Sequence, residues 1–155
     1  MDMKLKFDVV IDKEREFKFD LEDELAINPN NLDREMREQP TVFDKFATLA
    51  AMTKAKADRA EYRLEECEAE LFLKFKALKE KESFTESQIK SKITIDSKRL
   101  ALVNRLVAAQ EQHGIVVAAK EAFAQRKDCL ISLGATRRAE FEGTGEISIK
   151  KRRKE

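Results

Sequence analysis

The sequence predicts a mainly α protein built on a long antiparallel helical hairpin, with a small N-terminal β-hairpin and homo-oligomeric assembly. Three observations favour this class. Residues 41–81 contain no Gly or Pro, charged residues make up 39% of the 155-residue chain, and the whole chain has only four Gly and two Pro. Highly charged segments with helical periodicity are typical of long helices, whereas β-rich domains need many turn residues. We divide the chain into an acidic N-terminal hairpin and linker (1–39), a helical core (40–143), and a short strand with a basic tail (144–155).

Two runs of alternating apolar and polar residues open the chain. Residues 5–11 and 17–21 place aromatic or aliphatic side chains at every second position, and Lys13-Glu14-Arg15 lies between the two runs. This alternation predicts two strands of a hairpin. Because an isolated two-stranded hairpin is only marginally stable in water, we expect it to dock on a helix or on another chain.

The first long helix is predicted to begin after Pro40. Asn28-Pro29-Asn30-Asn31 breaks the chain, residues 32–38 predict a short helix that Pro40 closes, and Thr41 is placed to cap the long helix. In this helix small and apolar residues recur in steps of three and four. This seam consists of Phe43, Phe46, Ala50, Thr53, Ala57, Ala60, Leu64, Cys67, Leu71 and Leu78. A stripe this narrow requires a partner helix.

Thr85 is placed to cap a second long helix that covers residues 86–133. We expect Asp96-Ser97 and Gly114 to bend this helix, and Gly134 to end it as a C-terminal cap. Two long helices joined by a short turn fold back antiparallel.

The end of the chain predicts a shorter helix over 135–141, a strand over 146–149 and a basic run over 150–154. A single helical hairpin leaves apolar surface uncovered, including Phe72 and Phe75. We therefore expect neighbouring subunits to cover this surface in a homo-oligomer.

Sequence patterns for catalysis and cofactor binding are missing. His113 is the only histidine and lies among apolar residues of a predicted helix, which favours a structural role. No Gly-rich phosphate-binding loop is present. Cys67 and Cys129 are too far apart in sequence for a metal or disulfide motif, and we expect both to be buried. We therefore predict no enzymatic activity and no cofactor.

No run of about 18 apolar residues suits a membrane span, and no apolar leader opens the sequence. These features favour a cytoplasmic protein without a membrane partner.

Charge is unevenly distributed along the chain, although the formal net charge is only +1. Residues 1–39 carry seven Lys/Arg against twelve Asp/Glu, and residues 126–155 carry nine against five. Such asymmetry suggests different partners for the two ends. The acidic segment could also compete with nucleic acid for a basic face.

Cations gather on the first long helix. Lys56, Arg59 and Arg63 advance by three and four, so they share one face. Fixed cations can hold phosphates, and an aromatic ring such as Tyr62 can stack on an unpaired base. The candidate DNA-binding residues are Lys54, Lys56, Arg59, Tyr62, Arg63, Arg137 and Arg138. Further cations that could join this surface are Lys90, Lys92, Lys98 and Arg99. The alternative is a solvated helix surface stabilised by ion pairs with neighbouring glutamates.

Two segments carry a family resemblance. They are KAKADRAEY (residues 54–62) and AAKEAFAQR (118–126), which continues through RRAEFEG (137–143). These segments resemble the recombination-mediator family of T-even-type phages (the UvsY type). One Tyr stands where that family tends to have a pair.

The resemblance implies a ring-shaped homo-oligomer that binds single-stranded DNA. Such a mediator helps load a RecA-like recombinase onto DNA covered by a single-strand binding protein. The resemblance places Lys56, Arg59 and Tyr62 in contact with DNA. The location would be the host cytoplasm if the chain is phage-encoded. The alternative function is a non-enzymatic coiled-coil structural or interaction protein without DNA binding, which the near-neutral total charge favours.

Overall fold

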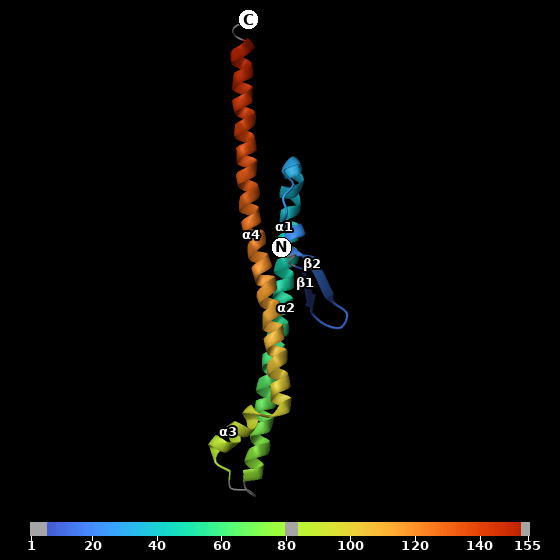
Figure 1. Ribbon diagram of the computed structural model, residues 1–155, viewed down its shortest axis with the longest axis vertical. Helices are drawn as coiled ribbons and strands as arrows, with labels where there is room; N and C mark the ends of the chain where they lie inside the picture. Colours follow the sequence, from blue (N-terminus) through green and yellow to red (C-terminus); the bar gives the residue numbers. More distant parts are fainter. Residues whose placement is uncertain (1–5, 80–83, 153–155) are drawn as a thin grey trace, which may run out of the picture. The chain divides into compact units, whose positions relative to one another are not determined.

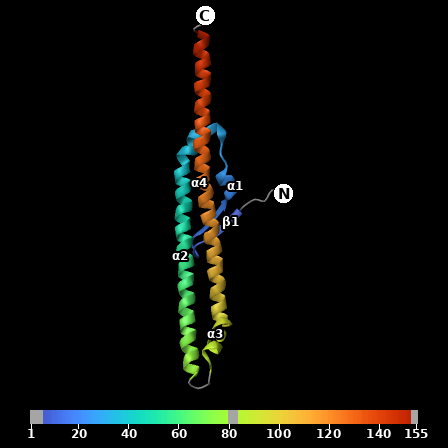
Figure 2. The same ribbon diagram turned by 90° about the vertical axis from the view of Figure 1, so that its left-hand side faces the viewer.

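The computed structural model describes residues 6–79 and 84–152, with side chains described for 7–78 and 84–142. In chain order the elements are β1 (Lys6–Val10), β2 (Glu16–Asp20), α1 (Leu21–Leu25), the 3-10 helix η1 (Pro29–Asn31), α2 (Leu32–Lys79), α3 (Glu86–Thr94) and α4 (Ser97–Arg152). The long helices α2 and α4 run antiparallel, and β1 pairs with β2 in a two-stranded sheet (Figures 1 and 2). The predicted helical hairpin and N-terminal β-hairpin are confirmed.

The described residues form two compact units, and each unit collects segments that are distant in sequence. Unit 1 contains the chain up to Asp8, residues Phe17–Ala47, and α4 from Ala118 onward. Unit 2 contains Val9–Glu16 and Thr48–Val117. Both long helices therefore contribute to both units.

Aromatic rings form the core of unit 1. The rings of Phe7 and Phe19 lie 5.8 Å apart, and Phe19 meets Phe46 edge to face at 5.1 Å. Phe46 in turn stacks on Phe123 of α4 at 4.6 Å, and both of these rings are fully buried. Such aromatic pairs stabilise beyond their buried area. The β-hairpin therefore docks on a helix, as its marginal intrinsic stability requires.

Polar contacts fix the antiparallel register of unit 2. Thr53 of α2 meets His113 of α4, with Oγ1 and Nδ1 3.1 Å apart. Further along α2, Glu68 accepts a 2.6 Å hydrogen bond from Arg99 of α4. Residue numbers on α4 therefore decrease as those on α2 increase, as antiparallel helices require. Between these contacts the predicted seam is buried at Ala57 and Cys67. At Thr53 the seam thus faces the other helix of the same chain.

The helix α2 begins at Leu32 and continues through Pro40, so the break predicted at Pro40 and the cap predicted at Thr41 are wrong. Proline has no N–H, so the helix loses one backbone hydrogen bond there. Tertiary contacts hold the first two turns in place: Leu32 is buried, and the Gln39 side chain donates a 2.7 Å hydrogen bond to the Phe123 carbonyl. These contacts offset the local preference for a break.

The predicted second helix is divided into α3 and α4. The Thr85 cap is confirmed, since Thr85 and Gln88 form a reciprocal capping box at the start of α3. The interruption at Asp96-Ser97 is also present. The Asp96 carboxylate accepts hydrogen bonds from the N–H groups of Lys98 (2.9 Å) and Arg99 (3.3 Å), which begins α4.

Neither Gly114 nor Gly134 ends or caps a helix, because α4 passes through both. A Cβ built on Gly134 would lie 2.5 Å from Cε of Met36 on α2. Because Met36 approaches so closely, this position favours a residue without a side chain. The C-terminal cap predicted at Gly134 is wrong, since α4 continues past it.

The strand predicted over 146–149 is also wrong, since α4 continues to Arg152. A strand needs a neighbouring strand to satisfy its backbone groups, whereas a growing helix satisfies its own. The last residues of the predicted basic tail, Arg153 and Lys154, lie outside the described residues.

The short helix α1 was not expected, because residues 17–21 alternate like a strand to their end. Asp20 caps this helix by accepting hydrogen bonds from the N–H groups of Glu22 (3.2 Å) and Asp23 (3.4 Å). An aspartate followed by acidic residues is a usual helix start, and this signal outweighs the alternation at Leu21.

Candidate nucleic-acid interface

Unit 2 contains a hollow of about 640 Å³ that is surrounded by cationic side chains. We call it the cationic hollow. Its cations come from three segments: Lys13 and Arg15 from the β1–β2 loop, Lys56, Arg59 and Arg63 from α2, and Arg105 from α4. Apart from the single carboxylate of Asp12 and the amide of Gln112, its other lining residues are Ile11, Ala60, Leu102, Ala108 and Ala109. The hollow therefore combines positive charge with small apolar surface.

Helical spacing explains the contribution of α2. Lys56, Ala60 and Arg63 follow each other at steps of four and three, so they lie on one face of the helix. All three line the hollow. The short side chain of Ala60 leaves open space between the two cations.

Lys56 connects the three segments of the hollow. Its Nζ donates hydrogen bonds to the Val10 carbonyl of β1 (2.5 Å) and to Oε1 of Gln112 on α4 (2.9 Å). The predicted DNA contact at Lys56 is thus occupied by contacts within the protein. This residue ties the hairpin to the helices and adds its charge to the lining of the hollow.

Five cations of the hollow have no carboxylate partner among the residues that the structure describes: Lys13, Lys56, Arg59, Arg63 and Arg105. Lys98 and Arg99 differ, since they pair with Glu70 (2.7 Å) and Glu68 (2.6 Å). Unpaired cations that share one concave surface raise the local potential and attract anions.

Arg15 is the cation of the hollow that has an acidic partner. Its Nε donates a 2.8 Å hydrogen bond to Oδ2 of Asp12, and Nη2 donates to the same oxygen. The other carboxylate oxygen, Oδ1, accepts the backbone N–H groups of Glu14 and Arg15, both at 3.0 Å. The hydrogen bond from Arg15 lowers the pKa of Asp12, and the same contact raises the pKa of Arg15.

Two predicted DNA-binding residues on α2 lie outside the hollow. Lys54 pairs with Asp58 at 2.7 Å, and Tyr62 is 71% exposed. Lys54, Asp58 and Tyr62 follow at steps of four and so form a different face from that of Lys56 and Arg63. The structure therefore does not bring Tyr62 together with Arg59 and Arg63 in one hollow.

Arg137 and Arg138 belong to unit 1 and take no part in the cationic hollow. Both are exposed on α4. The guanidinium carbon of Arg137 lies 5.9 Å from the ring centre of Phe141.

Sequence reasoning missed Lys13, Arg15 and Arg105 as members of the site. The first two lie in the loop between the strands, where a short run of charges is the usual composition of a turn. Arg105 becomes recognisable once the register of the helices is known, because antiparallel pairing places it opposite residues near Ala60 and Arg63. That register comes from the structure.

The remaining features concern the two cysteines, metal ligands and membrane-spanning helices. Cys67 is buried as expected, whereas Cys129 is exposed, so that expectation is wrong for Cys129. Among the side chains described for residues 7–78 and 84–142, no group of three from His, Cys, Asp or Glu could hold a metal ion. Over the same part of the chain, no helix has the length and apolar character needed to cross a membrane.

No protein-family model, curated protein or solved structure matches this chain. The chemistry of the cationic hollow therefore follows from its own residues. Fixed guanidinium and ammonium groups bind phosphate oxygens, and guanidinium groups can do so with two parallel hydrogen bonds. The hollow is suited to holding an anionic backbone.

Proposed function

We propose that this protein binds single-stranded DNA through the cationic hollow. In this proposal it acts as a recombination mediator that helps load a RecA-like recombinase onto DNA covered by a single-strand binding protein. The observation that supports DNA binding is the convergence of six cations from three segments around one hollow with a single carboxylate. The mediator role is supported by the resemblance of residues 54–62 and 118–143 to the UvsY type.

The shape and lining of the hollow favour a single strand. The phosphates of a single strand can meet the cations while its unpaired bases reach the apolar surface around Ala60 and Ala108. In a duplex the bases are stacked and paired, and this surface would be out of reach. One hollow can contact only a few nucleotides. We therefore propose that a homo-oligomeric ring repeats it, since linked weak contacts raise avidity without new chemistry.

The test is a titration of a fluorescent oligothymidylate by anisotropy at several salt concentrations. On a single strand, each phosphate contact contributes about −0.7 to the slope of log affinity against log salt. A variant that loses one contact should therefore show a slope that is less steep by about 0.7. We expect this loss for Arg59→Gln, for Arg63→Gln and for Arg105→Gln.

Arg37→Gln is a matched control for Arg59→Gln. Both arginines are exposed on α2, and the Nε of each donates to the carbonyl four residues earlier, Asp33 and Ala55 respectively, at 3.0 Å. Arg37 lies in unit 1 and does not line the hollow. Equal losses in the two variants would contradict binding at the hollow. The absence of any binding by the wild-type protein would contradict DNA binding itself.

The mediator role needs its own assay. Recombinase loading onto DNA already covered by a single-strand binding protein should be accelerated by the wild-type protein and not by Arg59→Gln/Arg63→Gln. If the wild-type protein binds the strand but does not accelerate loading, the mediator proposal fails and DNA binding stands.

A second candidate is a coiled-coil interaction protein without DNA binding. It is favoured by the apolar side chains that α4 leaves exposed in unit 1, including Ile131 and Leu133. This candidate predicts oligomers by light scattering together with no affinity for the labelled strand at moderate salt.

A further inference from the structure

We propose that Asp12 occupies the position of a phosphate in the cationic hollow, and that a bound strand takes Arg15 away from it. This inference rests on the proposed DNA binding and concerns how the same site is regulated. In this inference the β1–β2 loop supplies Arg15, which binds the strand, and Asp12, which competes with the strand for Arg15.

The two oxygens of Asp12 have different roles. Oδ1 is held by the backbone N–H groups of Glu14 and Arg15, so the loop itself fixes the carboxylate. Oδ2 receives the Arg15 guanidinium. The carboxylate is therefore the stationary partner, and the long arginine side chain is the one that can move.

Exchange of Arg15 from carboxylate to phosphate costs little. The side chains of Arg15 and Asp12 are 53% and 44% exposed, and ion pairs this accessible contribute only weakly to stability. A guanidinium binds phosphate with the same forked geometry that it uses for carboxylate. A phosphate in the hollow would in addition meet Arg59, Arg63 and Arg105, which no carboxylate occupies among the described residues.

Asp12 remains at the edge of the hollow after the exchange, because its contacts with the backbone N–H groups of Glu14 and Arg15 do not depend on the Arg15 side chain. Its negative charge then opposes the strand. The Asp12 carboxylate should therefore keep the affinity below the value that the surrounding cations alone would give.

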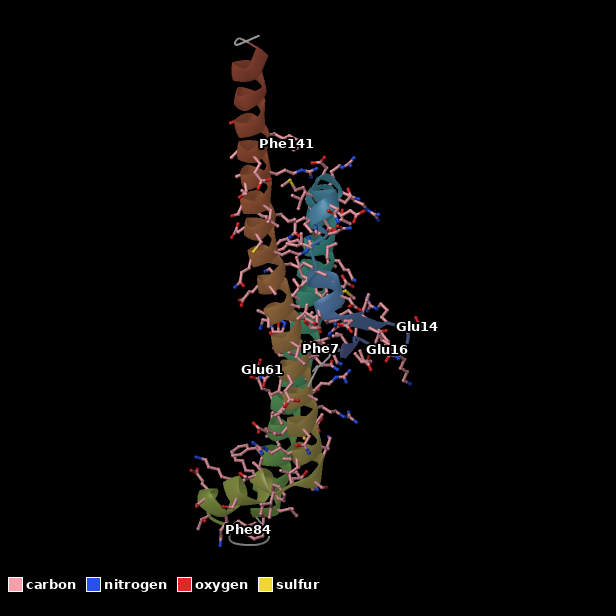
Figure 3. The ribbon with its side chains drawn as sticks, turned by 45° about the horizontal axis from the view of Figure 1, so that its top comes forward. Phe7, Glu14, Glu16, Glu61, Phe84 and Phe141 are labelled. Carbon is pink, nitrogen blue, oxygen red and sulfur yellow. The ribbon has the colours of Figure 1, made fainter. Side chains whose placement is uncertain are left out.

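The decisive variant is Asp12→Asn. The amide oxygen of Asn can still accept the loop N–H groups, while the ion pair with Arg15 is lost. The matched control is Glu14→Gln, which changes the net charge equally in the same loop. Glu14 does not line the hollow, and Figure 3 shows it at the outer end of the loop.

In the oligothymidylate titration, Asp12→Asn should bind about two- to fivefold more tightly than the wild-type protein, the range expected for a weak exposed ion pair. The salt slope should stay close to that of the wild-type protein, because Arg15 contacts the strand in both bound states. Glu14→Gln should leave the affinity close to the wild-type value, and Arg15→Gln added to Asp12→Asn should remove the gain.

The outcomes separate this inference from the proposed function. If the wild-type protein binds and Asp12→Asn behaves like Glu14→Gln, or binds no more tightly than the wild-type protein, the inference is overturned and DNA binding stands. If neither protein binds, both proposals fail.

A second measurement avoids variants altogether. In the wild-type protein the NMR resonance of the Arg15 Nε–H should shift when the strand is added, and the pKa of Asp12 should rise toward its ordinary value. An unchanged resonance at saturating strand would overturn the inference.

Discussion

Arg126 on α4 donates a 2.6 Å hydrogen bond from Nη1 to Oε1 of Gln39, whose Nε2 donates to the Phe123 carbonyl at 2.7 Å. The same guanidinium donates from Nε to the Leu25 carbonyl at 3.1 Å and from Nη2 to the Ala26 carbonyl at 3.0 Å. Nη2 also pairs with Glu35. The buried Arg126 side chain therefore satisfies two backbone carbonyl groups at the end of α1. It also holds the first turns of α2, before Pro40, through Glu35 and Gln39.

Arg126→Met should destabilise the protein by about 3–5 kcal/mol, because it leaves a largely buried carboxylate at Glu35 and several carbonyl groups without their partner. Arg137→Met is the control, since Arg137 is exposed on the same helix. Urea denaturation followed by circular dichroism measures both. A change below about 1 kcal/mol for Arg126→Met would show that the cluster is not an anchor.

The pKa of Asp12 should lie below its ordinary value of 3.8 because Arg15 stabilises the charged form. The stabilisation is complete above the unfolded-state pKa and is lost as the pH falls through the lower folded-state pKa, so the affected range is below about pH 4. Carbon-13 NMR of the carboxyl group measures the titration. Arg15→Gln should raise the pKa of Asp12, whereas Lys13→Gln should change it less.

Lys56→Met should loosen the β-hairpin, because it removes the hydrogen bonds to Val10 and Gln112. We expect faster amide hydrogen exchange at residues 9–11, with a smaller change near the Phe46–Phe123 stack. Strand binding should weaken indirectly, through displacement of the loop. Unchanged exchange at residues 9–11 would mean that the hydrogen bonds of Lys56 do not stabilise the hairpin.

Gly114→Ala should stabilise the protein by about 1 kcal/mol, since Gly is a poor helix former and an added Cβ meets nothing within 4 Å. Gly134→Ala should gain less, because the new methyl group must displace the tip of the Met36 side chain. Thermal unfolding of the two variants compares them directly. An equal gain would mean that Met36 moves without cost.

Ala57→Leu should overpack the helix pair and cost about 1–3 kcal/mol, because Ala57 is buried in the seam. Ala60→Leu should cost less, since Ala60 is only partly buried and borders the cationic hollow. The larger side chain at position 60 should instead weaken strand binding. Denaturation and the oligothymidylate titration separate the two effects.

The fold class could be predicted from the sequence because it depends on periodicity. Steps of three and four along residues 43–71 require a helix with a partner, and alternation in the first 20 residues requires strands. These patterns reflect local geometry and the burial of apolar side chains, which a single sequence records. The same reasoning located Arg59 and Arg63 on one helix face.

Element boundaries depended on contacts between distant residues. Pro40 ought to end a helix, yet α2 passes through it because Arg126 and Phe123 hold the preceding turn. Gly134 ought to cap a helix, yet α4 continues through it, and the glycine instead leaves room for the Met36 side chain of α2. Local propensities are worth about 1 kcal/mol for Gly and about 3 kcal/mol for Pro, so a few buried hydrogen bonds can override them.

Periodicity in the sequence is enough to predict long helices that carry a buried seam and a set of cations at helical spacing. Which cations share a surface depends on how distant segments pack together. The antiparallel register brought Arg105 to Arg59 and Arg63, the docked hairpin added Lys13 and Arg15, and helix geometry turned Lys54 and Tyr62 away. The physical reason is that a site requires several segments at defined positions, and those positions are set by packing between residues that are far apart in the chain.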